Sequence, residues 1–148
     1  MNTHPYLRAY MADIVVPTIV LVILLTAFVI ARFVCSMPVP IERAMIFPMA
    51  LVPSVFGLWN MFHLWLHAYG RLPIGFHGAL LPFLLVPCGL ILAKALNILA
   101  VNSAGVTYFE AITVPYAFLA IGFSIGLIAY YLIWKYLVGF FNRVLGIA

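Results

Sequence analysis

The chain has 148 residues, of which 68% are hydrophobic and only 7% are charged. A soluble domain carries about 25% charged residues, so this composition excludes an ordinary water-soluble globule. A membrane-spanning helix needs about 20 mostly apolar residues. The length therefore allows four spans and predicts a single all-α integral membrane domain.

The net charge is +4, from seven Lys and Arg residues against three Asp and Glu residues. The cations stand singly at the ends of the predicted spans, without a basic run or a basic patch interleaved with aromatic residues. This distribution argues against nucleic acid as a partner. It is typical of side chains that anchor helices to anionic headgroups, so membrane lipid is the expected partner.

The first two spans are predicted over residues 11–34 and 44–67. A helix is expected for both, because an isolated strand cannot satisfy its backbone hydrogen bonds in lipid. Pro48 and Pro53 lie inside the second span and predict a bend there. The link over residues 35–43 contains two prolines and two charges and is expected to be a short turn.

The third and fourth spans are predicted over residues 77–100 and 111–134. A short hairpin rich in Gly and Pro over residues 68–76 makes the second and third spans adjacent and antiparallel. The link over residues 101–110 is the most polar stretch, and residues 135–144 are predicted to lie along the interface as an amphipathic helix. We therefore predict an up-down-up-down bundle with short links and a C-terminal interfacial helix.

The Lys and Arg residues near the span ends predict the orientation of this bundle. On the side of both termini lie Arg8, Arg71, Lys135 and Arg143. On the other side lie Arg32, Arg43 and Lys94. The side with the termini thus has four Lys and Arg residues against three, and this small excess of positive charge predicts that both termini are cytoplasmic.

Three of the four histidines lie in the stretch NMFHLWLHAYGRLPIGFH, residues 60–77. Asn60, His63 and His67 are spaced i, i+3 and i+7, so they share one face of a helix. The other candidates at this end of the bundle are Arg71 and His77 in the hairpin region and Asp13 in the first span. These six residues are the candidate pocket or ligand residues.

The histidines allow three interpretations. His63, His67 and His77, with Asp13 as a partner, could hold Zn, Cu or Fe. Haem or quinone contact is the second, although His63 and His67 share a face and cannot both be axial ligands of one haem. The preferred interpretation is a polar rim whose imidazoles hydrogen-bond to loops, headgroups and water.

A second polar cluster is predicted at the opposite end, formed by Glu42, Arg43, Lys94 and Glu110. Lys94 lies inside the third span and could pair with Glu110 or Glu42. A proton or ion relay is one interpretation. A snorkelling lysine with a salt bridge at the membrane rim is the preferred one.

Gly122 and Gly126 in the fourth span form a GxxxG pattern, which lets two helices approach closely. The partner helix could belong to the same chain or to a second copy. The sequence leaves both alternatives open.

Catalytic patterns are missing from the sequence: it has no Ser-His-Asp arrangement, phosphate loop, CxxC motif or paired carboxylates. We therefore expect a non-enzymatic membrane module that binds a hydrophobic or amphiphilic ligand, alone or as a subunit of a larger membrane assembly. The first alternative is a metal- or haem-dependent redox protein. The second is an oligomeric transporter or channel, with Asn60, His63 and His67 facing a shared pore.

Overall fold

The computed structural model describes residues 4–38, 40–67, 70, 72–110 and 112–147. The prediction of four helices of membrane-spanning length is confirmed, since four helices are long and apolar enough to cross a membrane. The elements in chain order are α1 (Pro5–Phe33), α2 (Ile41–His67), α3 (Ile74–Ala95), β1 (Leu99–Val101), β2 (Gly105–Tyr108), β3 (Ile112–Pro115), α4 (Tyr116–Leu132), the π-helical η1 (Ile133–Val138) and α5 (Gly139–Val144).

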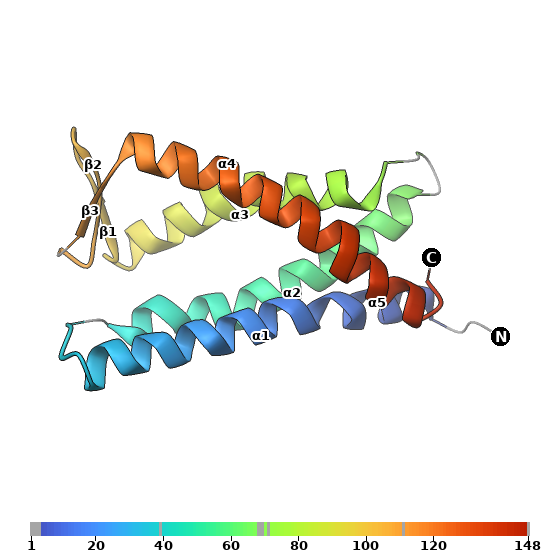
Figure 1. Cartoon of the computed structure of the whole chain (residues 1–148), viewed down its shortest axis with the longest axis horizontal. Coiled ribbons are helices and arrows are strands. Elements are labelled where there is room, and N and C mark those ends of the chain that lie inside the picture. Colours follow the sequence, from blue (N-terminus) through green and yellow to red (C-terminus); the bar gives the residue numbers. More distant parts are fainter. Residues whose placement is uncertain (1–3, 39, 68–69, 71, 111, 148) are drawn as a thin grey trace.

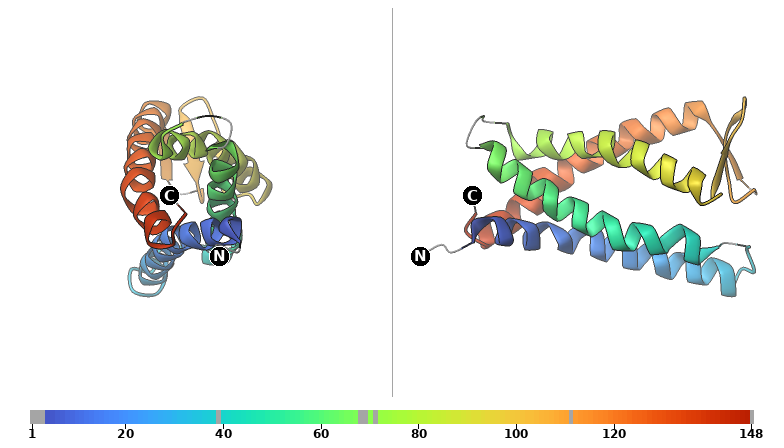
Figure 2. Two further views of the ribbon diagram at one scale, coloured as in Figure 1. Left: turned by 90° about the vertical axis from the view of Figure 1, so that its right-hand side faces the viewer. Right: turned by 180° about the vertical axis from the view of Figure 1, so that it is seen from behind.

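The helices form two pairs. In Figure 1, α1 and α2 lie side by side and α3 packs with α4. The pairs meet at the end that holds both chain termini and diverge toward the other end, as the view from behind in Figure 2 also shows. The contacts between the pairs are therefore concentrated at the end with the termini.

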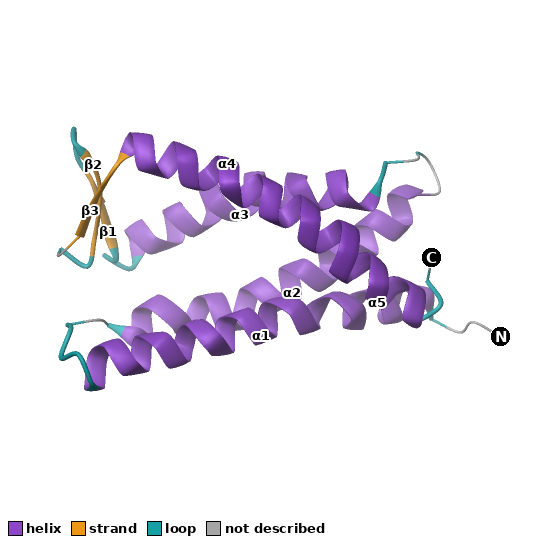
Figure 3. Ribbon diagram, in the orientation of Figure 1, coloured by secondary structure: helices purple, strands orange, loops and turns teal. Residues whose placement is uncertain are grey.

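A small antiparallel sheet of order β1-β2-β3 follows α3 (Figure 3), which the all-α prediction missed. Val101 pairs with Val106, and Val106 pairs with Val114 on the next strand. The Asn102 side chain closes the first turn, because its Oδ1 accepts the backbone N–H groups of Ala104 at 3.0 Å and Gly105 at 2.9 Å. The third helix therefore ends at Ala95 and the fourth begins at Tyr116, inside the boundaries expected from hydropathy.

The helix is not interrupted at residue 135, where the predicted interfacial segment would begin, and the placement of that segment along the membrane interface stays a prediction. The helical segment Tyr116–Val144 is 29 residues long and includes η1 and α5. The π-helical turn accommodates additional backbone within a helix, and both Trp134 and Val138 are completely buried in η1. The C-terminal segment is thus packed into the bundle.

The core lies where the two helix pairs meet. Phe56 of α2, Leu81 of α3, and Trp134 and Val138 of η1 form one buried cluster. The Trp134 ring lies 6.3 Å from the Phe56 ring, centroid to centroid. Outside this cluster many large apolar side chains are exposed on every long helix, a pattern typical of surfaces that face lipid.

Candidate functional site

A cavity of about 500 Å³ lies at the end of the molecule that holds both termini. It is bounded by the C-terminal part of α2, the start of α3, and η1 with α5. We call it the histidine pocket. Its polar lining residues are Asn60, His63, His67, Lys135, Asn142 and Arg143. Its volume falls within the roughly 300–1,000 Å³ range of small-molecule sites.

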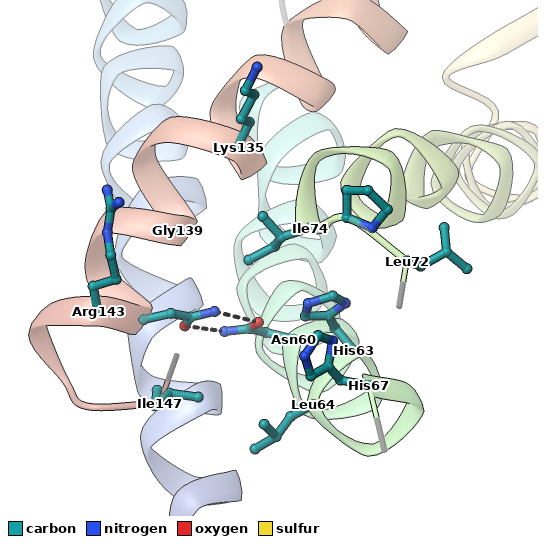
Figure 4. A pocket seen from close by; sticks show the side chains of 12 residues that line it. Asn60, His63, Leu64, His67, Leu72, Ile74, Lys135, Gly139, Arg143 and Ile147 are labelled. Atoms are coloured by element: carbon teal, nitrogen blue, oxygen red, sulfur yellow. Dashed lines mark hydrogen bonds between the residues drawn. The ribbon is translucent and has the colours of Figure 1, made fainter. Parts of the chain in front are cut away.

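Helical spacing explains how these side chains come together. The structure confirms that Asn60, His63 and His67 share one face of α2, since all three line the pocket. Lys135 of η1 and Asn142 of α5 line the pocket from the opposing helix. In Figure 4 the two histidine rings lie beside each other, next to Asn60.

An asparagine pair forms the buried floor of the histidine pocket. Asn60 Nδ2 donates to Asn142 Oδ1 at 2.9 Å, and Asn142 Nδ2 donates to Asn60 Oδ1 at 3.2 Å (Figure 4). Asn60 Nδ2 also donates to the Ala9 carbonyl oxygen at 2.8 Å. The two side chains therefore join α1, α2 and α5 at one point.

Among the described residues, every ionisable side chain that lines the pocket is basic, namely His63, His67, Lys135 and Arg143. In Figure 4 the Lys135 and Arg143 side chains extend away from the asparagine pair, which places their charges on the rim. Lys135 Nζ lies 5.6 Å from the Tyr131 ring centroid and 5.3 Å from that of Tyr136. The pocket is thus chemically suited to an anion.

His77 lies in α3 and is buried, but it does not line the pocket. Its Nε2 lies 3.1 Å from the Trp59 carbonyl oxygen, while Trp59 Nε1 donates to the His77 carbonyl oxygen at 3.0 Å. A carbonyl oxygen can only accept, so Nε2 carries the proton and donates. His77 therefore joins α2 to α3.

The metal prediction for His63, His67 and His77 gains no support. The described part of the chain contains no group of three or more His, Cys, Asp or Glu residues that could hold a metal ion. His63 and His77 are close, with ring centroids 4.7 Å apart, but the Nε2 atom of His77 is occupied by Trp59. Asp13 does not line the pocket, and Arg71 lies outside the described residues.

Asp13 in α1 is completely buried, and neither carboxylate oxygen has a hydrogen-bond partner within the described ranges. A buried polar atom without a partner costs about 1–3 kcal/mol of stability.

We expect Asp13→Leu to raise the free energy of unfolding by at least about 1 kcal/mol, measured by thermal unfolding in detergent. Asp13→Asn is the control, because it keeps polar atoms at the same place and should gain less. A lower unfolding temperature for Asp13→Leu would contradict the prediction.

The polar cluster predicted at the opposite end does not form as one unit. Glu42 pairs with Arg32, with Arg32 Nη1 2.8 Å from Glu42 Oε1. Lys94 lies instead on a separate groove between α3 and α4. Glu110 is exposed after β2. No ion pair joins Lys94 to Glu42 or to Glu110 among the described residues.

Gly122 and Gly126 do not serve as a packing seam within the described chain. A Cβ atom at either position would meet no other atom within 4 Å. Both glycines line the groove that also contains Lys94. A seam with a second copy stays a prediction.

Asn142 is the site residue that sequence reasoning missed. It lies within the segment that was predicted to rest on the membrane interface, yet it is only 3% exposed. The available signal was a single amide side chain within the largely apolar stretch YLVGFFNRV. An amide there needs a partner, but the sequence does not say which helix supplies it.

Comparisons of the chain with protein-family models, with curated proteins and with solved structures found no match.

Proposed function

We propose that this protein is a multi-pass membrane protein that binds the phosphate group of an anionic amphiphile in the histidine pocket. The observation that supports this most directly is the lining: within the described ranges it contains His63, His67, Lys135 and Arg143 but no acidic side chain. Cationic and imidazole donors favour phosphate, and charge-assisted hydrogen bonds are stronger than neutral ones. The asparagine pair holds the opposing helices at a fixed separation.

We further propose that the four long helices cross the membrane in alternating directions, with both termini on the cytoplasmic side. The described chain ends lie at the same end of the molecule as the histidine pocket (Figure 1). Arg8 also lies there and donates to the Leu145 carbonyl oxygen at 3.4 Å. An anionic cytoplasmic leaflet attracts basic residues, so this orientation would bring the pocket close to its ligand.

A binding role is favoured over catalysis because the described residues of the pocket combine cations and amides and include no nucleophile held against a base. The protein would act as a ligand-binding module or as a ligand-binding subunit of a larger membrane assembly. A redox role through bound metal is less well supported, since the three clustered histidines do not form a ligand set.

Removing both rim cations tests this proposal. We expect Lys135→Gln/Arg143→Gln to weaken binding of phosphatidylglycerol by about 2 kcal/mol, or roughly 30-fold, at about 1 kcal/mol for each cation. Native mass spectrometry of the detergent-solubilised protein measures this, with phosphatidylcholine as the zwitterionic reference. Added inorganic phosphate should compete if the site recognises phosphate alone, and should not if the acyl chains are also needed.

The matched control is Arg32→Gln/Arg43→Gln, which removes the same charge from the opposite end of the molecule. It should leave phosphatidylglycerol binding within about twofold, because neither arginine lines the histidine pocket. An equal loss of phosphatidylglycerol binding in both double variants would show that binding depends on overall charge and not on the pocket. No loss in the pocket variant would contradict the proposed site.

A further inference from the structure

A second cavity, of about 740 Å³, lies between α3, the sheet and α4. We call it the apolar groove. It lies away from the histidine pocket and shares no lining residue with it. Leu90 and Ile91 of α3, Val106 of β2 and Leu119 of α4 contribute to its predominantly apolar lining.

Two glycines, which have no side chain, leave space for this groove. Gly122 and Gly126 lie four residues apart on the same face of α4, and a Cβ atom at either would meet nothing within 4 Å. The lining extends along α4 from Tyr116 to Tyr130, which is about 21 Å at the α-helical rise. An acyl chain in one leaflet spans about 15 Å, half the hydrocarbon core. The groove is therefore long enough to hold one such chain.

The apolar lining of the groove includes a positively charged side chain. In the described part of the chain Lys94 is the one charged residue that lines the groove, and it lies in the last turn of α3. The ion pair in the described ranges joins Arg32 to Glu42, so Lys94 has no acidic partner there. Tyr108 and Tyr116 line the same end of the groove, and tyrosine is typical of the membrane interface. The apolar groove therefore has one cation, without an acidic partner among the described residues, at its interfacial end. This arrangement is complementary to a ligand with one alkyl chain and one negative charge.

We propose that the apolar groove binds a long-chain fatty acid, with its carboxylate at Lys94 and its alkyl chain along Gly122 and Gly126. Lys94 can neutralise one carboxylate, and the apolar groove is long enough for one alkyl chain. This site is additional to the histidine pocket and does not depend on the function proposed for it.

Photo-crosslinking tests the proposal. The protein is reconstituted in phosphatidylcholine nanodiscs with a palmitic acid probe that carries a diazirine on its alkyl chain, and labelled peptides are mapped by mass spectrometry. We expect labelling on the segments that line the groove, with competition by unlabelled palmitate. The methyl ester of the same probe should label the groove about fivefold less, because it lacks the charge that Lys94 attracts.

Gly126→Leu should block the groove, since the new side chain enters space that is open in the protein. Gly89→Leu is the matched control, because Gly89 also has no neighbour within 4 Å of a built Cβ and does not line the groove. We expect groove labelling to fall at least about fivefold in Gly126→Leu, as one apolar group displaces another, and to persist in Gly89→Leu. Thermal unfolding of both variants tests whether they remain folded.

Lys94→Gln should lower labelling by the acid about fivefold and leave labelling by the ester unchanged, whereas Lys94→Arg should retain the preference for the acid. Labelling spread evenly over exposed helix faces, or equally reduced by Gly126→Leu and Gly89→Leu, would overturn the site. Equal labelling by acid and ester would overturn the carboxylate assignment. Stronger competition by phosphatidylglycerol than by palmitate would replace the fatty acid by a membrane phospholipid and overturn it as well.

Discussion

Gly78→Ala is expected to lower the free energy of unfolding by about 2–3 kcal/mol, as overpacking of a well-filled core does. A Cβ atom at Gly78 of α3 would overlap Cβ and Cγ of Trp134. These atoms are close to the η1 backbone, so they cannot move aside as the end of a flexible side chain would. Trp134 is completely buried, and the strain would reach the whole contact between α3 and η1.

Thermal or denaturant unfolding in detergent measures this effect. Gly89→Ala in the same helix is the control, since a Cβ atom there meets nothing within 4 Å. It should be neutral or stabilising by up to about 1 kcal/mol, because alanine favours helix more than glycine does. If both variants unfold at the same temperature, the predicted packing of Gly78 against Trp134 is wrong.

Asn60→Leu is expected to destabilise the protein by about 2–4 kcal/mol, because it leaves buried polar partners unsatisfied at about 1–3 kcal/mol each. The substitution removes the two hydrogen bonds that connect Asn60 with Asn142 and the one to the Ala9 carbonyl oxygen. Leucine has a similar volume, so the loss should come from the unpaired groups rather than from a cavity. Thermal unfolding of the ligand-free protein in detergent measures it.

A double-mutant cycle separates the pair from the individual residues. Asn60→Leu/Asn142→Leu should cost clearly less than the sum of the two single substitutions, since it leaves no unpaired amide side chain at that point. Strict additivity would show that the two asparagines act independently. That result would contradict their role as the link between α2 and α5.

The two predictions concern the same end of the molecule. Gly78 sets how closely η1 approaches α3, and the asparagine pair sets how α5 approaches α2 and α1. Both contacts position the helix that carries Lys135 and Arg143 beside His63 and His67. The proposed phosphate site therefore depends on packing as much as on its charged residues.

The sequence by itself determined the number and approximate extent of the membrane-length helices. Hydropathy is a local property, and only apolar segments of about 20 residues suit a membrane span. It also placed Asn60, His63 and His67 on one helical face, because the spacing i, i+3, i+7 follows from the helical repeat alone. Neither inference needed a partner segment.

The sheet could be predicted only in part. Its strands contain β-branched residues, and Asn102 followed by Ser103, Ala104 and Gly105 is a turn signal. However, three- and four-residue strands are stable only once paired, so hydropathy assigned their ends to the neighbouring spans. The pairing decided where α3 ends and α4 begins.

Only the tertiary structure decided which helix each face meets. Asn60 and Asn142 are 82 positions apart, and the pairing of His77 with Trp59 and of Glu42 with Arg32 also depends on how the helices pack. The physical reason is that apolar helix faces are nearly equivalent in lipid, so small residues and polar pairs select the contacts. A helical repeat defines a face, but it does not define the neighbour of that face.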